Sequence, residues 1–184
     1  NNCYCLMDSY RTLRKATQEL YKEKGSKFFA YAFPIDSKDD VKKYLEDIKV
    51  DHPKARHICY AFLIQEGKED YYIANDDGEP NNSAGMPILG QIRSNNLSHV
   101  LIAVVRYFGG TKLGLSGLIS AYKESASMCI YEENIIEVEP KSIISFSCSY
   151  HIMGQVLAII DKNNLDAKIE HLDTCLLYTS PSPR

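Results

Sequence analysis

The pattern of apolar and polar residues predicts a mixed chain of strands and helices. Apolar residues that alternate with polar ones, or that form runs of about four to eight, indicate strands, whereas apolar residues at i, i+3 and i+4 indicate helices. By these criteria we expect strands at 12–22, 27–33, 57–64, 71–74 and 100–105. We expect helices at 39–50, 84–93 and 118–133.

Local signals place the ends of several elements. Ser37 is a suitable N-cap for the first helix, and Asp39 and Asp40 lie in its first turn, where the helix dipole favours negative charge. Pro87 is compatible with the second helix only in the first turn, because proline has no N–H to donate. Gly25 supplies a turn between two strands, and Gly67 the turn of a later hairpin.

A change of composition near Glu139 and Pro140 divides the chain. We expect the main domain at 10–139. Beyond it, a strand at 143–150, a helix at 153–163 and a strand at 167–172 would form one β-α-β unit. Such a unit buries little surface alone, so we interpret 140–174 as part of a small α+β domain. Residues 1–9 are expected to be a leader and 175–184 an adapter-derived tail.

The composition, 45% hydrophobic and 24% charged, is typical of a globular protein. The net charge of -3 excludes a global positive field, so any contact with RNA requires a local basic patch. The cysteines form no Cys-x-x-Cys pair, and we expect buried thiols with no metal site and no cofactor. No apolar run approaches the roughly 18 residues that span a bilayer, so we expect a cytoplasmic protein without a membrane partner.

A glycine-rich loop between the strand at 100–105 and the following helix is the strongest physical signal in the chain. Glycine lets a ligand or another backbone approach closely, and a helix N-terminus favours an anion. The spacing matches neither a dinucleotide-binding fingerprint nor a P-loop. The loop could hold a phosphate, or it could simply be a tight turn that packs a helix on a sheet. Its candidate ligand-binding residues are Gly109, Gly110, Lys112 and Gly114.

The segment 76–80 concentrates three carboxylates in a turn. Asp76, Asp77 and Glu79 could hold a hard cation or supply a general base. Alternatively, the first aspartate caps local N–H groups and Glu79 pairs with an arginine. The sequence leaves both possibilities open and favours the second.

His57 opens a strand and could assist catalysis, although a histidine there is more often a hydrogen-bonded structural residue. Cys59 would lie on the same strand face, but its apolar neighbours favour an inert thiol. No serine has the frame of a nucleophile elbow. Basic residues from several segments could form one face if the fold brings them together. These residues are Lys24, Lys27, Arg56, Arg93, Arg106 and Lys112.

Read in order, four segments resemble the YigZ/IMPACT family. They are 24–28 (KGSKF), 57–61 (HICYA), 76–89 (DDGEPNNSAGMPIL) and 104–122, which contains RYFGGTKLG. The chain departs from the family pattern at Asn81-Asn82-Ser83, where small residues such as Ser-Gly-Thr are usual, and at Ser116, where glycine is common. The first departure weighs against a ligand contact in the acidic loop.

The resemblance implies an α+β fold. Its first domain, the Impact N-terminal domain, would be similar to ribosomal protein S5 domain 2, and a truncated ferredoxin-like β-α-β unit would follow. Similar domains occur in elongation factor G. The resemblance therefore favours a translation-associated regulator that binds RNA or a ribosomal partner through the basic residues given above. The alternative is an enzyme acting on a phosphorylated small molecule or nucleotide, with His57, Asp76, Asp77 or Glu79 in the site. No nucleophile–base pair can be assembled from spacing, so we favour a binding module.

Overall fold

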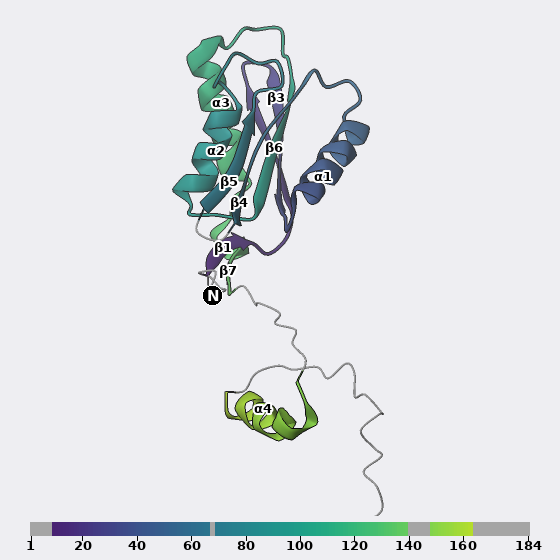
Figure 1. The fold of residues 1–184 in the computed structure, drawn as a ribbon. Coiled ribbons are helices and arrows are strands. Elements are labelled where there is room, and N and C mark those ends of the chain that lie inside the picture. The colour runs from purple at the N-terminus through teal and green to yellow at the C-terminus, as the bar shows by residue number, and fades with distance from the viewer. Residues whose placement is uncertain (1–8, 67–68, 140–147, 164–184) are drawn as a thin grey trace, which may run out of the picture. The chain divides into compact units, whose positions relative to one another are not determined.

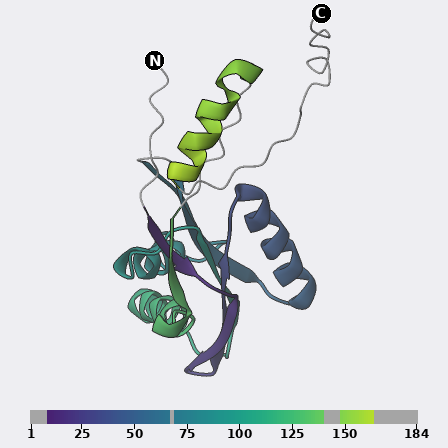
Figure 2. The ribbon, with the colours of Figure 1, turned by 90° about the horizontal axis from the view of Figure 1, so that it is seen from below.

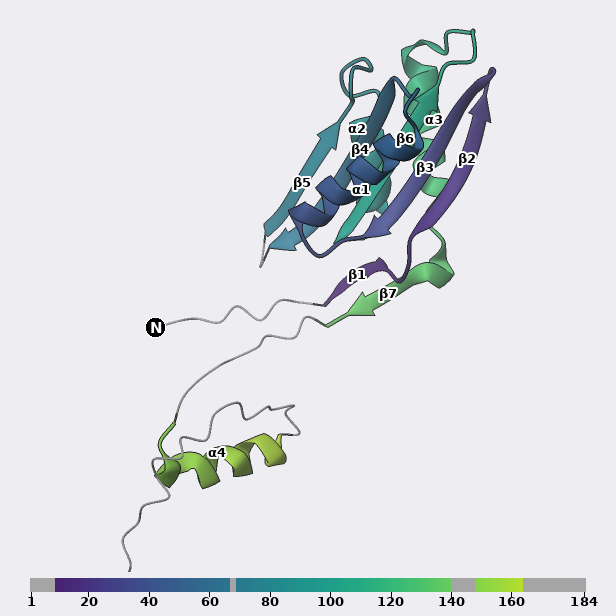
Figure 3. The same cartoon turned by 90° about the vertical axis from the view of Figure 1, so that its right-hand side faces the viewer.

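An antiparallel sheet forms the centre of the first of two units in the computed structural model. The units are Asn1–Lys141 and Ser142–Arg184. The structure describes residues 9–66, 69–139 and 148–163. The sheet has five strands in the order β2-β3-β6-β4-β5, and every neighbouring pair is antiparallel (Figures 1 and 3). The strands are β2 (Thr17–Glu23), β3 (Ser26–Pro34), β4 (His57–Glu66), β5 (Glu69–Asn75) and β6 (Val100–Tyr107).

Helices cover both faces of this sheet, which explains why its central strand is apolar throughout. Side chains alternate between the faces along a strand. On β6, Val100, Ile102 and Val104 pack with helices α2 (Gly85–Ser94) and α3 (Gly114–Met128). Leu101 and Ala103 belong instead to the clusters under helix α1 (Lys38–Asp51). Figures 1 and 2 show α1 on one side of the sheet and α2 and α3 on the other.

The helix ends follow the predicted local signals. The Ser37 hydroxyl accepts from the Asp40 N–H, and the Asp40 carboxylate accepts from the Ser37 N–H, which completes a capping box at the start of α1. Pro87 is the third residue of α2, where its missing N–H breaks no helical hydrogen bond. The predicted strands at 27–33, 57–64, 71–74 and 100–105 are confirmed with ends shifted by one or two residues.

The prediction of a single strand at 12–22 is wrong. The segment covers the end of β1 (Tyr10–Leu13) and most of β2, and β1 pairs with the unpredicted strand β7 (Ile135–Val138) in a separate small sheet. The bend between β1 and β2 is held by Asn134, whose side chain bonds both the N–H and the carbonyl of Lys15. The sequence pattern at 12–22 is continuous, but Asn134, which is distant in the sequence, holds a bend within it.

The predicted helix at 118–133 begins and ends too late. Helix α3 begins at Gly114, which takes a positive φ of 73°, and its last residue is Met128. Residues Glu132–Asn134 form a separate 3-10 turn before β7. The glycine loop is therefore shorter than predicted, because Gly114 and Gly117 already belong to the first turn of the helix.

In the second unit the described residues include one helix, α4 (Tyr150–Lys162), close to the helix predicted at 153–163. Tyr150, the end of the strand predicted at 143–150, belongs to this helix. Residues 143–147 of that prediction and the strand at 167–172 lie outside the described residues, as does the Gly67 turn. Among the helices that the structure describes, none combines the length and the apolar character needed to cross a bilayer.

Two glycines bring the β2–β3 turn against the loop that follows β6. A Cβ on Gly109 would lie 1.8 Å from the carbonyl carbon of Gly25, so only glycine allows this contact. Gly25 also takes a φ of 81° at the hairpin turn, which favours glycine. The Gly109 N–H donates to the Ser26 hydroxyl across the same contact, at 3.2 Å. The predicted close backbone approach thus occurs, but the partner of Gly109 is another loop.

Gly109→Ala is expected to lower the free energy of unfolding by at least about 1–3 kcal/mol, because the added methyl forces the two loops apart. Urea unfolding followed by circular dichroism measures the change. Gly90→Ala is the matched control, since a Cβ at this exposed position in α2 meets nothing within 4 Å. It should raise stability by up to about 1 kcal/mol. Equal stability of the two variants would contradict the contact.

Candidate functional site

The acidic segment forms a tight turn that starts helix α2. The Glu79 N–H donates to the Asp76 carbonyl, and the two central residues, Asp77 and Gly78, take φ values of 42° and 84°. Positive φ at both positions is typical of a type I′ turn. The Asp76 carboxylate accepts from the N–H groups of Asn82, Ala84 and Gly85 at 2.8–3.0 Å. It therefore satisfies N–H groups at the start of α2 that have no partner within the helix.

The next residue ties the turn to the start of β4. The Asp77 carboxylate accepts from the Ile58 N–H at 2.6 Å. The Asp77 carbonyl lies 2.8 Å from Nδ1 of His57. Because a carbonyl only accepts, Nδ1 carries the proton. In the neutral ring, Nε2 is then left as an acceptor, so the turn fixes both the position and the tautomer of His57.

Glu79 enters the protein interior and pairs with Arg106. Its Oε1 lies 2.5 Å from an Arg106 terminal nitrogen, and the Arg106 and Glu79 side chains are only 9% and 5% exposed, respectively. The Tyr122 hydroxyl of α3 donates to the same oxygen at 3.0 Å. The Phe28 ring of β3 packs edge-on against Tyr122. This buried cluster joins the turn to β3, β6 and α3.

Cys59 borders the cluster and is poorly suited to act as a nucleophile. Its thiol donates to the Asp76 carbonyl at 2.9 Å and lies 3.4 Å from the Tyr122 hydroxyl. Burial raises the pKa of the Cys59 thiol to about 12, so the reactive thiolate is scarce at neutral pH. Burial also raises the pKa of Tyr122, which keeps its hydroxyl protonated as a donor to Glu79.

The carboxylates of the turn are thus all engaged in holding the fold. Asp76 and Asp77 accept from backbone N–H groups, and Glu79 accepts from Arg106 and Tyr122. Across the residues that the structure describes, no group of three or more His, Cys, Asp or Glu side chains could hold a metal ion. The structural interpretation of the turn is the one that these contacts support.

A cleft of about 400 Å³ opens beside this cluster, at the end of the sheet where β6 finishes and β4 begins. Its lining combines cationic, imidazole and aromatic side chains. These residues are Lys54, Arg56, His57, Arg106, Tyr107 and Phe108. Lys54 and Arg56 are exposed, whereas the charge of Arg106 is paired with Glu79. The cleft therefore offers two exposed cations beside aromatic rings, an arrangement suited to an anion with a flat ring.

Several predicted basic residues lie at the same end of the sheet. Lys27 pairs in register with Tyr107, which lines the cleft. Lys24 takes a positive φ in the hairpin turn that packs on Gly109, and Lys112 is exposed in the loop that follows. Gly110 and Gly114 both take positive φ, with open space where a Cβ would be. We call Lys24, Lys27, Lys54, Arg56 and Lys112 the basic end of the sheet.

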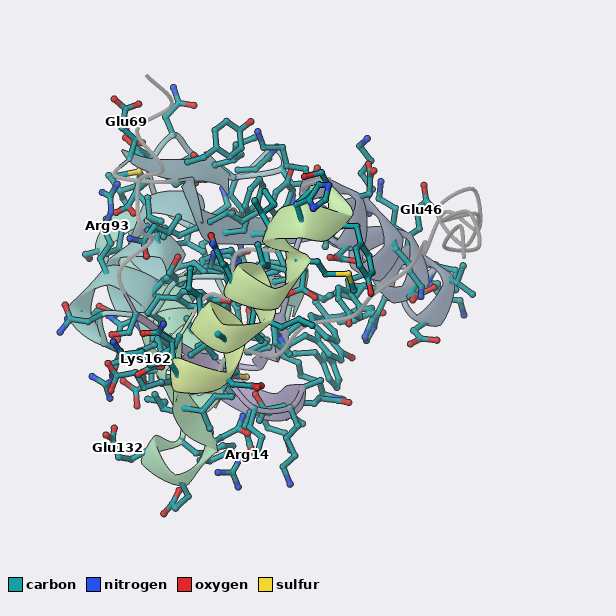
Figure 4. All side chains as sticks on the ribbon, turned by 60° about the horizontal axis from the view of Figure 1, so that its bottom comes forward. Arg14, Glu46, Glu69, Arg93, Glu132 and Lys162 are labelled. Carbon is teal, nitrogen blue, oxygen red and sulfur yellow. The ribbon has the colours of Figure 1, made fainter. Side chains whose placement is uncertain are left out.

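The structure separates Arg93 from this group. Arg93 stacks over the Tyr72 ring, with 4.2 Å between the guanidinium carbon and the ring centroid. Tyr72 pairs with Leu63, which pairs with Val100, six residues from Arg106 along β6. At about 3.3 Å per residue, the two ends of β6 are roughly 20 Å apart. Figure 4 brings forward the end of the sheet that carries Arg93 and Glu69.

Three residues of the cleft are not among those that the sequence predicts. Lys54 follows a proline in a short connection, and Tyr107 and Phe108 stand beside the glycines of the loop. Phe108 is 59% exposed. The sequence does not predict this exposure, because Phe108 directly follows an apolar strand and would be expected to be buried with it. The sequence signal that could have identified Phe108 is an aromatic residue directly before the glycines of the loop.

Arg106→Ala is expected to lower the free energy of unfolding by about 3–5 kcal/mol, because it leaves the Glu79 carboxylate buried without its cation. Urea unfolding of the purified variant measures the loss. The double replacement Arg106→Met with Glu79→Leu removes both charges and should recover most of that stability. A loss below about 1 kcal/mol in Arg106→Ala would show that the pair does not hold the cluster together.

The chain is similar to several known proteins, three of which are bacterial IMPACT family members. The chain is 32% identical over 151 residues to the IMPACT family member YvyE of Bacillus subtilis, covering 82% of the chain and 69% of the relative. It is 29% identical to YigZ of Escherichia coli, with 82% and 73% covered. An IMPACT family member of Thermus thermophilus is 32% identical, with 80% and 78% covered.

A solved structure, described as that of a hypothetical protein, has the same fold. It superimposes with a TM-score of 0.68 at 24% identity, covering 90% of this chain and 82% of the other. The family model of the Impact N-terminal domain matches residues 24–130, which include both the acidic turn and the glycine loop. The chain therefore belongs to the IMPACT family.

Proposed function

We propose that this protein is a translation-associated module that binds RNA through the basic end of the sheet. The observation that carries the proposal is the cleft, where Lys54 and Arg56 stand exposed beside Tyr107 and Phe108. The chain as a whole has a net charge of -3, so this concentration of cations is local. A local basic patch with aromatic side chains matches the chemistry of a nucleic acid, which offers phosphates and flat bases.

Lys24, Lys27 and Lys112 extend the positive surface from the cleft across the β2–β3 turn and the glycine loop. Phosphates spaced along a nucleic-acid strand would meet these side chains one after another. Binding of this kind releases counterions, so affinity depends steeply on salt. The family resemblance implies a likeness to translation-factor domains, and this expectation favours RNA or the ribosome as the source of the phosphates.

The geometry of the site supports the enzyme alternative less well than it supports RNA binding. The carboxylates that it needs are held by N–H groups, by Arg106 and by Tyr122. His57 does line the cleft, with its tautomer fixed by Asp77. A histidine without a second reacting group supports ligand contact more readily than catalysis.

The finer features of the predicted architecture belong to the same proposal. We infer that residues 10–139 form an α+β domain of the ribosomal protein S5 domain 2 type. We further infer that 140–174 form part of a ferredoxin-like unit. An RNA-binding or ribosome-binding role would place the protein in the cytoplasm.

Replacement of Lys54 and Arg56 by alanine is expected to weaken binding to a labelled single-stranded RNA and to ribosomes. Fluorescence anisotropy and co-sedimentation, each at several salt concentrations, measure the effect. For each phosphate that the variant no longer neutralises, the slope of log K against log salt should become shallower by about 0.7.

Arg93→Ala is the matched control, since it removes an exposed arginine at the opposite end of the sheet. Its affinity and salt slope should equal those of the unaltered protein. The proposal fails if the unaltered protein binds neither RNA nor ribosomes at low salt. It also fails if Arg93→Ala costs as much as the paired replacement.

A further inference from the structure

The cleft has the dimensions of a site for a small unit of a polymer. Ligand pockets in proteins usually enclose about 300–1,000 Å³. At about 400 Å³, this cleft lies near the lower limit. It can take a single nucleotide, whereas a longer stretch of RNA would have to follow the surface outside it. Three exposed lysines of the basic end, Lys24, Lys27 and Lys112, lie outside the cleft lining.

Phe108 is an unusual residue to find exposed on the cleft wall. It is 59% exposed, although its ring lies 5.8 Å from the guanidinium carbon of Arg106, which is buried. The aromatic ring therefore presents a face to solvent in a site that also contains cations. A nucleobase stacked on such a ring contributes about 1–3 kcal/mol to binding, with little dependence on sequence.

Tyr107, which also lines the cleft, is fixed by contacts with its neighbours. The Tyr107 hydroxyl lies 3.0 Å from Nδ1 of His52, and its ring packs edge-on against Phe29. The other His52 nitrogen lies 2.6 Å from the Tyr31 hydroxyl, which belongs to β3. Tyr107 is thus held by a hydrogen-bonded histidine and by a ring contact, so this part of the cleft lining is preorganised. A preorganised site loses less free energy on binding than a mobile one.

The polar side chains of the cleft include both cations and a hydrogen-bond acceptor, and a nucleotide needs both. Lys54 and Arg56 supply cations for a phosphate. His57 donates Nδ1–H to the Asp77 carbonyl, which leaves Nε2 of the neutral ring as an acceptor. A ribose hydroxyl or a base N–H could donate to it. The three kinds of group (cation, acceptor and exposed ring) correspond to the phosphate, the sugar or base edge, and the base face.

We infer that the cleft binds one unstacked nucleotide, with its base on Phe108 and its phosphate at Lys54 and Arg56. The inference rests on the proposed function for its polymeric ligand and adds that the RNA is single-stranded. In a duplex the bases are stacked and paired, so a duplex would reach only the cations. The protein should therefore prefer single strands through Phe108 and bind any RNA through the basic end.

The test compares a single-stranded RNA, a duplex of the same sequence and adenosine 5′-monophosphate as ligands of the full chain. The unaltered protein should bind the single strand at least about tenfold more tightly than the duplex. Phe108→Ala should weaken single-strand binding about 5- to 150-fold, the equivalent of one stacked base, and leave duplex binding unchanged. Phe108→Tyr keeps a ring and should retain the preference.

Tyr72→Ala is the matched control, because Tyr72 is also an exposed aromatic, at 47%, but lies on β5 at the other end of the sheet. It should leave all three affinities unchanged. Thermal unfolding of each variant establishes that the fold is intact, which is expected for exposed positions such as Phe108 and Tyr72.

The possible outcomes separate this inference from the proposed function. Equal binding of single strand and duplex, with no effect of Phe108→Ala, overturns the nucleotide cleft while RNA binding stands. Binding of adenosine 5′-monophosphate that disappears in Phe108→Ala, without RNA binding, supports the cleft and overturns the RNA role. If no ligand binds even at low salt, both are overturned.

Discussion

The buried pair of Arg106 and Glu79 is the interaction on which the rest of the site depends. Taking both charges out of water costs several kcal/mol each, and their close contact and added hydrogen bonds must compensate. Tyr122 supplies one of these bonds from α3, and Phe28 encloses the pair from β3. Such a pair tolerates little displacement, because moving one partner leaves the other charged and unsatisfied. It therefore fixes where the acidic turn stands relative to the sheet.

The same pair explains why two motifs far apart in the sequence belong together. Glu79 is part of the acidic turn, and Arg106 is the first residue of the segment that continues into the glycine loop. Their contact places the turn over the start of β4, where Asp77 holds His57, and beside the end of β6, where Phe108 follows. The two motifs are thus halves of one structural unit. The cleft lies where they meet, which neither motif reveals separately.

Local physics predicts most elements of the fold, because long apolar runs and caps act over a few residues. The central strand and the first helix with its Ser37 cap depend on such signals alone. The errors arise where distant contacts decide. Asn134 bends the chain near Lys15, and the short strand β7 exists because β1 pairs with it. Arg93 lies apart from the other basic residues for the same reason. Only the strand register shows that Arg93 and Arg106 lie near opposite ends of β6. Of the candidate site, the structural role of the turn is predictable, but the exposure of Phe108 is not.

The division between buried and exposed residues has a consequence for function. The distinctive residues of the two motifs, such as Asp76, Glu79 and Gly109, are engaged in hydrogen bonds or backbone contacts and sustain the fold. Lys54, Arg56 and Phe108 are exposed, and exposed positions usually contribute little to stability. Binding can therefore change at these positions while the scaffold stays intact. A shared scaffold motif thus need not imply a shared ligand, because the surface of the cleft can vary at little cost to folding.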